Sequence, residues 1–137
     1  YQKFVNLITK KKLNKKCRIL DHLNNEDLKM MYHCSNLIIS APLKPEGFGR
    51  TISESLSMEK ILLAYNFGGA QDQLRDLDNI YKVIPKDHNQ MIFKINNLLN
   101  LEKEKINNLG IKARNHIIKN FSKEKMLKSY LKFYHEL

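Results

Sequence analysis

Two glutamates separated by seven residues, Glu46 and Glu54, are the residues whose types and spacing suggest chemistry in this chain of 137 residues. Ionised carboxylates are pure hydrogen-bond acceptors, and each of the two is suited to bind vicinal hydroxyls of a sugar. Gly47 and Gly49 lie between them and allow the backbone to approach a ligand closely. The segment from Arg50 onward has helical character, and the N–H groups and dipole at a helix start favour a phosphate oxygen. The pattern therefore indicates a site for a sugar and a phosphate.

The neighbouring segments predict how these residues are positioned. Residues 37–40 form a short apolar run, which is typical of a buried parallel strand. A loop over 41–49 follows, then a helix over 50–58 and another apolar strand over 61–64. Ligands of open α/β sheets bind outside the carboxyl ends of the strands. The loop leaves its strand at that edge, so both glutamates are expected to face the ligand crevice.

Strands alternate with helices along the rest of the chain, with further strands predicted at 17–20 and 80–84. This alternation predicts an α/β fold: a Rossmann-like parallel sheet with flanking helices and a helical C-terminal end. The helix starts are expected at Asn24 or Asn25, at Asp87 with Gln90, and at Ser122. Residues expected to face the core from the helices are Phe4, Val5, Ile8, Leu28, Met31, Tyr32, Met91, Ile92, Ile95, Leu98, Leu99, Ile106, Leu109, Ala113, Ile117, Met126, Leu127, Tyr130, Leu131 and Tyr134.

Composition narrows the class of protein further. The chain is 42% hydrophobic, which is typical of one globular domain, and it has no apolar run long enough to span a membrane. Its net charge of +10 comes from 20 lysines and only 4 arginines. Nucleic-acid surfaces usually use arginine as well, whereas Lys, Asn and Ile share A/T-rich codons, so genome composition is favoured over a selected basic patch. Cys17 and Cys34 are expected to be reduced core residues.

Two candidate metal sites are weak. Asp76 and Asp78 have the spacing of a metal-binding Asp-x-Asp pair, but they precede a predicted strand where that motif normally follows one. A solvated turn is the favoured interpretation. A zinc site would need short, regular ligand spacing, which the four candidate residues lack. Those four residues are Cys17, His22, His33 and Cys34.

The sequence around the two glutamates resembles family 4 retaining glycosyltransferases, whose signature is Glu-x7-Glu. Residues 46–49 read EGFG, as is usual in that family, and 54–58 read ESLSM, similar to its EAMAM. The resemblance extends from residue 17 to residue 137. Other matching segments are the strand at 61–64, the Gly68-Gly69 turn, the FS pair at 121–122 and the segment 130–134.

The resemblance implies the GT-B architecture, in which two Rossmann-like domains face a cleft. Residues 1–137 would be a single, partial nucleotide-sugar-binding domain, with upstream βα units and an acceptor-binding domain expected before Tyr1. The implied activity is transfer of a hexosyl group, with retention, from a nucleoside diphosphate sugar to an unknown glycan or lipid-linked acceptor. This fragment alone is expected to be inactive. We expect no cofactor, no metal and no nucleic-acid partner, and a cytoplasmic location with peripheral contact at the inner membrane surface.

The family also implies a role for each residue of the motif. Its first glutamate is catalytic and faces the donor sugar, and its second binds the nucleotide ribose. Carried over to this chain, the roles are Glu46 for catalysis, the backbone of Gly47, Phe48 and Gly49 for sugar hydroxyls, the amides of Arg50 and Thr51 for the diphosphate, and Glu54 for the ribose.

This chain differs from the family after the glutamate-bearing helix. The family has Gly-Lys-Pro there, and this chain has Glu59, Lys60 and Ile61. Loss of that glycine costs about 1 kcal/mol if the backbone still needs a positive φ.

Two alternative functions are open from the sequence. One is a nucleotide- or sugar-binding module without transfer activity, and the other is a basic nucleic-acid-binding domain built on the Lys-rich segment 10–16. Release of nucleotide separates an enzyme from a binding module, and steep salt dependence marks nucleic-acid binding.

Overall fold

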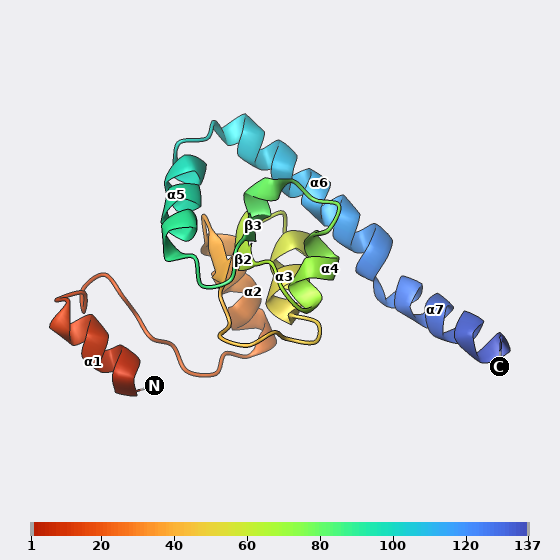
Figure 1. Cartoon of the computed structure of the whole chain (residues 1–137), viewed down its shortest axis with the longest axis horizontal. Coiled ribbons are helices and arrows are strands. Elements are labelled where there is room, and N and C mark those ends of the chain that lie inside the picture. Colours follow the sequence, from red (N-terminus) through yellow and green to blue (C-terminus); the bar gives the residue numbers. More distant parts are fainter. Residues whose placement is uncertain (1, 137) are drawn as a thin grey trace. The chain divides into compact units, whose positions relative to one another are not determined.

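The computed structural model describes residues 2–136, which form two compact units. One unit ends at Met30, and the other begins at Met31 and contains the whole sheet. Figure 1 shows the order of the elements along the chain.

The smaller unit begins with α1 (Gln2–Lys10), which confirms the helix predicted there. A strand was expected at 17–20, and this prediction is wrong: residues 17–24 are in neither helix nor strand. A strand needs a partner for its backbone hydrogen bonds, and no segment among residues 2–136 pairs with this one. The next helix, α2 (Asn25–Cys34), starts as predicted, because Asn24 Oδ1 accepts hydrogen bonds from the N–H groups of Glu26 and Asp27.

The sheet has three parallel strands in the order β1-β2-β3. Ile38 pairs with Leu62, and Ala64 pairs with Lys82. Every residue of the central strand is buried. The parallel α/β class is confirmed, although the described residues contain three strands where four were predicted. The strands are β1 (Ile38–Ser40), β2 (Leu62–Tyr65) and β3 (Lys82–Val83).

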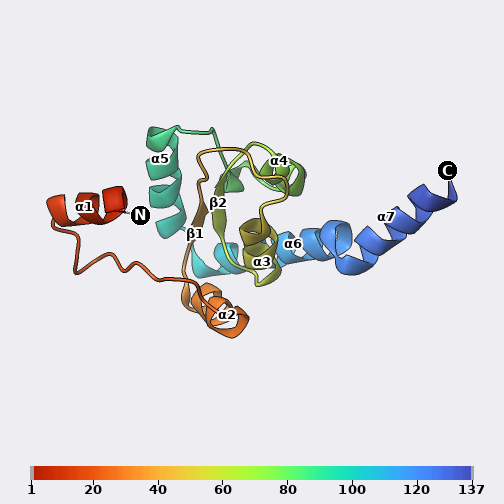
Figure 2. The same ribbon diagram turned by 90° about the horizontal axis from the view of Figure 1, so that it is seen from below.

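Helices cover both faces of this sheet. Figures 1 and 2 show α3 and α5 on opposite sides of β2, and α6 packs along α3. The helix α7 continues from the end of α6 and leads away from the sheet. The elements are α3 (Arg50–Ser57), α4 (Gly69–Leu74), the 3-10 turn η1 (Asn79–Tyr81), α5 (His88–Leu99), α6 (Lys103–Phe121) and α7 (Lys123–His135).

Two predicted helix caps are confirmed. The Asp87 side chain accepts a hydrogen bond from Gln90 N–H at 2.8 Å, and Ser122 Oγ accepts one from Lys125 N–H at 3.2 Å. Gln90 does not complete a capping box, because its Oε1 accepts from Ile84 N–H instead. That bond ties the start of α5 to the end of β3.

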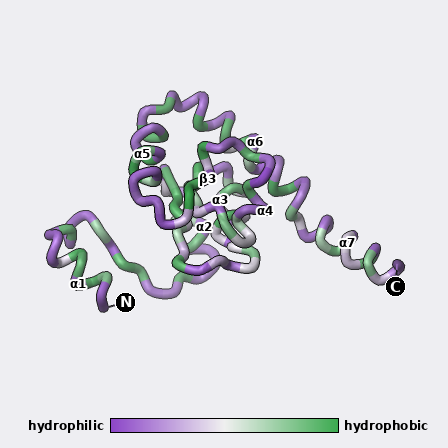
Figure 3. Tube along the Cα trace, in the orientation of Figure 1, coloured by the Kyte–Doolittle hydropathy of each residue, from purple (hydrophilic) through white to green (hydrophobic). Residues whose placement is uncertain are grey.

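Several residues expected to face the core are exposed. Ile92 and Leu99 of α5 are both more than half exposed, and α7 buries none of its residues. Cys17 and Cys34 are exposed free thiols, so their assignment to the core is also wrong. Hydrophobic and hydrophilic residues alternate along α5, α6 and α7 in Figure 3, as expected of amphipathic helices. None of the helices within residues 2–136 is both long and apolar enough to cross a membrane.

Candidate functional site

The loop before α3 carries the first group of predicted site residues. Gly49 is the N-cap of α3 and has φ 80°, a left-handed conformation that favours glycine. Because glycine has no side chain to cap the helix, the first amides of α3, on Arg50 and Thr51, are left to a ligand. A Cβ placed on Gly49 would lie 3.4 Å from Glu46 Oε2. The carboxylate of Glu46 is therefore beside the amino end of α3, where the helix dipole favours negative charge.

A tight turn at 68–69 supports this loop from the neighbouring strand. The N–H of Gly69 donates to Glu46 O at 2.9 Å. A Cβ on Gly69 would lie 2.4 Å from Gly47 O, and one on Gly68 would lie 2.7 Å from Glu46 O. Both contacts are too short for any side chain, so the turn and the loop pack directly through their backbones.

A buried glutamine and the end of α6 hold the other side of the loop. The fully buried Gln73 donates through Nε2 to the carbonyl oxygens of Phe48 and Gly49. His116 Nε2 lies 2.9 Å from Gln73 O and donates to it, since a carbonyl oxygen only accepts. The rings of Phe48 and Phe121 are 6.2 Å apart. Gln73 and His116 could not be identified from the sequence, because their partners are distant along the chain.

The second glutamate lies in α3 and is half-buried. Its Oε2 accepts a hydrogen bond from Tyr32 Oη at 3.1 Å, and its Oε1 lies 2.8 Å from Arg50 Nη2. Burial, followed by the negative charge of Glu54, raises the pKa of Tyr32 above its ordinary value. From the sequence, Tyr32 is predicted only to face the core. Its hydroxyl was the available signal, because a buried tyrosine usually finds a polar partner.

All seven predicted site residues thus lie on one continuous segment, 46–54, that runs from the loop into α3. Glu46, Gly47 and Phe48 are exposed, and a Cβ on Gly47 would meet nothing within 4 Å. The loop surface around Gly47 is therefore open, while its underside is fixed by the turn at 68–69 and by Gln73. This arrangement suits a ligand that lies across the loop and reaches the start of α3.

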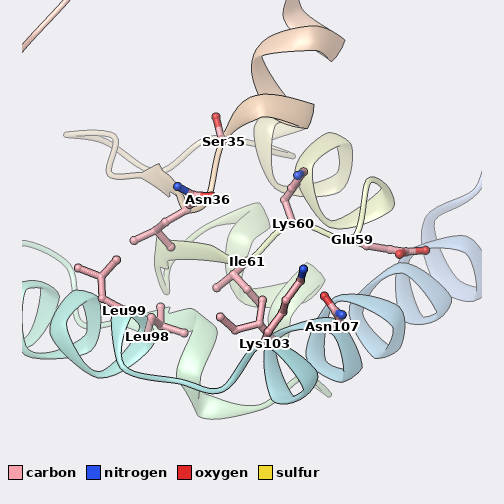
Figure 4. Close-up of a pocket in the computed structure, with 11 residues that line it drawn as sticks. Ser35, Asn36, Glu59, Lys60, Ile61, Leu98, Leu99, Lys103 and Asn107 are labelled. Carbon is pink, nitrogen blue, oxygen red and sulfur yellow. The ribbon is translucent and has the colours of Figure 1, made fainter.

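A separate cavity of about 490 Å³ lies at the opposite, amino-terminal edge of the sheet (Figure 4). It is bounded by the segments that enter β1 and β2, the end of α5 and the first half of α6. Neither Glu46 nor Glu54 lines it. Residues around it include Ser35, Lys60, Ile61, Leu98, Lys103 and Asn107.

The backbone near this cavity shows the conformation that Glu59 adopts where the family has glycine. Glu59 has φ 60°, so the position still adopts the left-handed conformation for which glycine is favoured. Gly110 of α6 packs against it, and a Cβ there would lie 2.3 Å from Glu59 O. The strain expected at Glu59 is therefore present in the fold.

The two weak metal candidates gain no support from the geometry. Asp78 Oδ1 accepts a hydrogen bond from Ile80 N–H at 2.9 Å and caps the η1 turn. Within residues 2–136, no three His, Cys, Asp or Glu side chains are grouped so as to hold a metal ion.

A parallel α/β sheet with a glycine-containing loop at its carboxyl edge, leading into a helix start, is a Rossmann-like fold. This chain belongs to the family described as "Glycosyl transferases group 1", whose sequence pattern matches residues 1–131. No curated protein shows significant similarity to the chain.

Solved structures agree with this assignment. A glycosyltransferase from Rickettsia africae ESF-5 is 35% identical over 96% of this chain, with a TM-score of 0.84. Sucrose-phosphate synthase from Thermosynechococcus elongatus (19% identity over 98% of the chain, TM-score 0.85) and TarM from S. aureus (24% over 96%, TM-score 0.80) share the fold. The TarM structure is a complex with UDP, fondaparinux and α-GlcNAc-glycerol. This chain corresponds to 34%, 33% and 26% of the lengths of the three proteins, respectively.

Proposed function

We propose that this chain supplies the donor-binding part of a retaining hexosyltransferase that uses a nucleoside diphosphate sugar. The observation that carries the proposal is the placement of Glu46 beside the start of α3 and of Glu54 one turn into it, with a glycine N-cap that leaves the first amides to a ligand. Membership of the group 1 glycosyltransferases supports this reading of the site. The UDP bound by TarM makes uridine diphosphate the first nucleotide to test.

In this proposal each group meets a different part of the donor. Glu54 accepts hydrogen bonds from the ribose hydroxyls, and the backbone of 47–49 contacts the hydroxyls of the sugar. As the bond from the anomeric carbon to the diphosphate breaks, negative charge grows on the leaving oxygen. The amides of Arg50 and Thr51 and the dipole of α3 stabilise that charge. The carboxylate of Glu46 orients the sugar and favours the positive character that develops at the anomeric carbon.

The proposal extends to the partners of this chain. The acceptor is a glycan or a lipid-linked sugar, held by a second Rossmann-like domain on the N-terminal side. We place the reaction in the cytoplasm, with peripheral contact at the inner membrane surface. No metal or cofactor takes part, because amides and the helix dipole neutralise the leaving diphosphate.

Glu54→Ala tests the nucleotide site directly. A hydrogen bond to a charged group contributes about 1.5–3 kcal/mol, so UDP affinity should fall about 10- to 150-fold. Calorimetric titration with UDP, ADP and GDP measures this change. Glu59→Ala is the matched control, because Glu59 is an exposed carboxylate just beyond the far end of the same helix. Unchanged affinity in Glu54→Ala would remove Glu54 from the site.

Cleavage of the sugar donor distinguishes a transferase from a protein that only binds the donor. We expect the complete enzyme, with its acceptor-binding domain, to release nucleoside diphosphate from a sugar donor in the presence of its acceptor, and NMR of the product should show the donor's anomeric configuration. Saturable donor binding without release would favour a binding module. A steep loss of binding to duplex DNA with added salt would instead indicate a nucleic-acid surface.

A further inference from the structure

Two hydrogen-bond donors that differ in charge and in exposure contact the carboxylate of Glu54. Tyr32 Oη donates to Oε2 at 3.1 Å from a side chain that is only 8% exposed. Arg50 Nη2 lies 2.8 Å from Oε1, and its side chain is 81% exposed. Glu54 therefore lies between a buried neutral donor and a solvent-exposed cation.

The buried donor, Tyr32, belongs to the same compact unit as α3. It lies near the end of α2, and the next residue, His33, accepts a hydrogen bond through its carbonyl oxygen from Lys60 Nζ at 2.6 Å. Lys60 follows the turn that ends α3, so this bond links the end of α2 to the segment after α3. Burial also raises the pKa of Tyr32 above its ordinary value. The phenol is thus a neutral donor held in the core.

The exposed donor is easier to displace. Arg50 and Glu54 form an ion pair one helical turn apart, and such solvent-exposed pairs are weak. A ribose hydroxyl that approaches Oε1 replaces a mobile guanidinium, whereas one that approached Oε2 would compete with a buried phenol. The two oxygens of Glu54 are therefore not equivalent toward a ligand.

We propose that Tyr32 is a positioning residue, which fixes Oε2 of Glu54 and leaves Oε1 as the oxygen presented to the nucleotide ribose. This inference rests on the proposed role of Glu54 in the donor site. A glutamate side chain that is free in solution loses rotamer entropy when it binds a ligand. Tyr32 reduces that loss by holding the carboxylate in place before the nucleotide arrives, which is a gain in affinity through preorganisation.

A double-mutant cycle in the full protein tests this role, with Tyr32→Phe, Glu54→Gln and the double variant titrated calorimetrically with UDP. Tyr32→Phe removes one oxygen atom and keeps the ring, so the core stays filled. We expect it to weaken UDP binding about fivefold, less than loss of the ribose contact itself, because the ligand must then order the Glu54 side chain. In the Glu54→Gln background the same change should have little effect, because the carboxylate that Tyr32 positions is gone.

Tyr81→Phe is the matched control. Its side chain is also buried, and its hydroxyl donates to Leu109 O of α6 at 2.9 Å and not to a residue of 46–54. It should lower thermal stability without changing UDP affinity. Thermal melts of every variant confirm that the protein is folded at the titration temperature.

The outcomes separate the two proposals. If Glu54→Gln leaves affinity for UDP, ADP and GDP unchanged, then Glu54 is outside the donor site. The proposed role of Tyr32 would be refuted by the same result. If Glu54→Gln weakens binding but Tyr32→Phe has no effect, or weakens binding equally in both backgrounds, then the positioning role is wrong and the donor site stands. Equal losses in Tyr32→Phe and Tyr81→Phe would likewise overturn the positioning role, since they would indicate a general structural effect.

Discussion

Replacing Gly69 with alanine tests whether the loop 46–49 forms the donor site. The added Cβ would lie 2.4 Å from Gly47 O and 2.6 Å from Phe48 Cα. Ordinary van der Waals contact begins at 3.4 Å, so the loop or the start of α4 must move by about 1 Å. The hydrogen bond from Gly69 N–H to Glu46 O would be distorted by the same movement.

The size of the effect follows from that displacement. A misplacement of about 1 Å in a catalytic site lowers turnover about 100-fold, because the reacting groups lose their alignment. Overpacking in a filled region also destabilises the fold by about 1–3 kcal/mol. In the complete enzyme, Gly69→Ala should therefore reduce both donor turnover and the free energy of unfolding.

Gly110→Ala separates these two effects. Its Cβ would lie 2.3 Å from Glu59 O, a clash of the same size at the amino-terminal edge of the sheet. Urea unfolding should show similar losses of stability for both variants. Release of nucleoside diphosphate and UDP affinity should fall only in Gly69→Ala. The reasoning is refuted if Gly69→Ala loses stability but keeps full affinity and turnover, or if Gly110→Ala loses activity to the same extent.

Three further predictions concern strain, metal dependence and pH. Glu59→Gly should raise the free energy of unfolding by about 1 kcal/mol in urea melts, because Glu59 has φ 60°; an unchanged or lower value would contradict the strain. Turnover by the complete enzyme should survive EDTA, since Asp78 caps a turn, and loss that manganese restores would overturn the proposed metal independence. Burial, and then Asp78, raises the pKa of Tyr81 above 10.0, so the unfolded chain loses its phenolic proton first as the pH rises. The free energy of unfolding should therefore fall above about pH 10, and Tyr81→Phe should reduce that fall; equal slopes would refute it.

Features set by neighbouring residues could be predicted from the sequence. The caps at Asn24, Asp87 and Ser122 depend on a side chain and a backbone amide two or three residues away, and all three are present. The loop over 46–49 and its entry into α3 were likewise located correctly, because glycine and the apolar runs on either side mark the turn.

Features that need a distant partner could not be predicted. The run at 17–20 has the composition of a strand, but no segment of the described chain pairs with it. Ile92 and Leu99 follow the helical period of α5 and are nevertheless exposed, because periodicity does not show how wide the covered face is. The contacts of Tyr32 and Gln73 with the site span more than 20 positions in the sequence.

The contact between Gly69 and Glu46 has a practical consequence for spectroscopy. Glycine amides often resonate apart from the crowded region of an N–H correlation spectrum, and this one is buried and bonded to the loop that carries Glu46. Its chemical shift should therefore change when a nucleotide sugar occupies the loop. Its rate of exchange with deuterium should report how often the loop separates from the turn at 68–69 in the empty protein. A single backbone signal would then follow the site without any label on the donor or the acceptor.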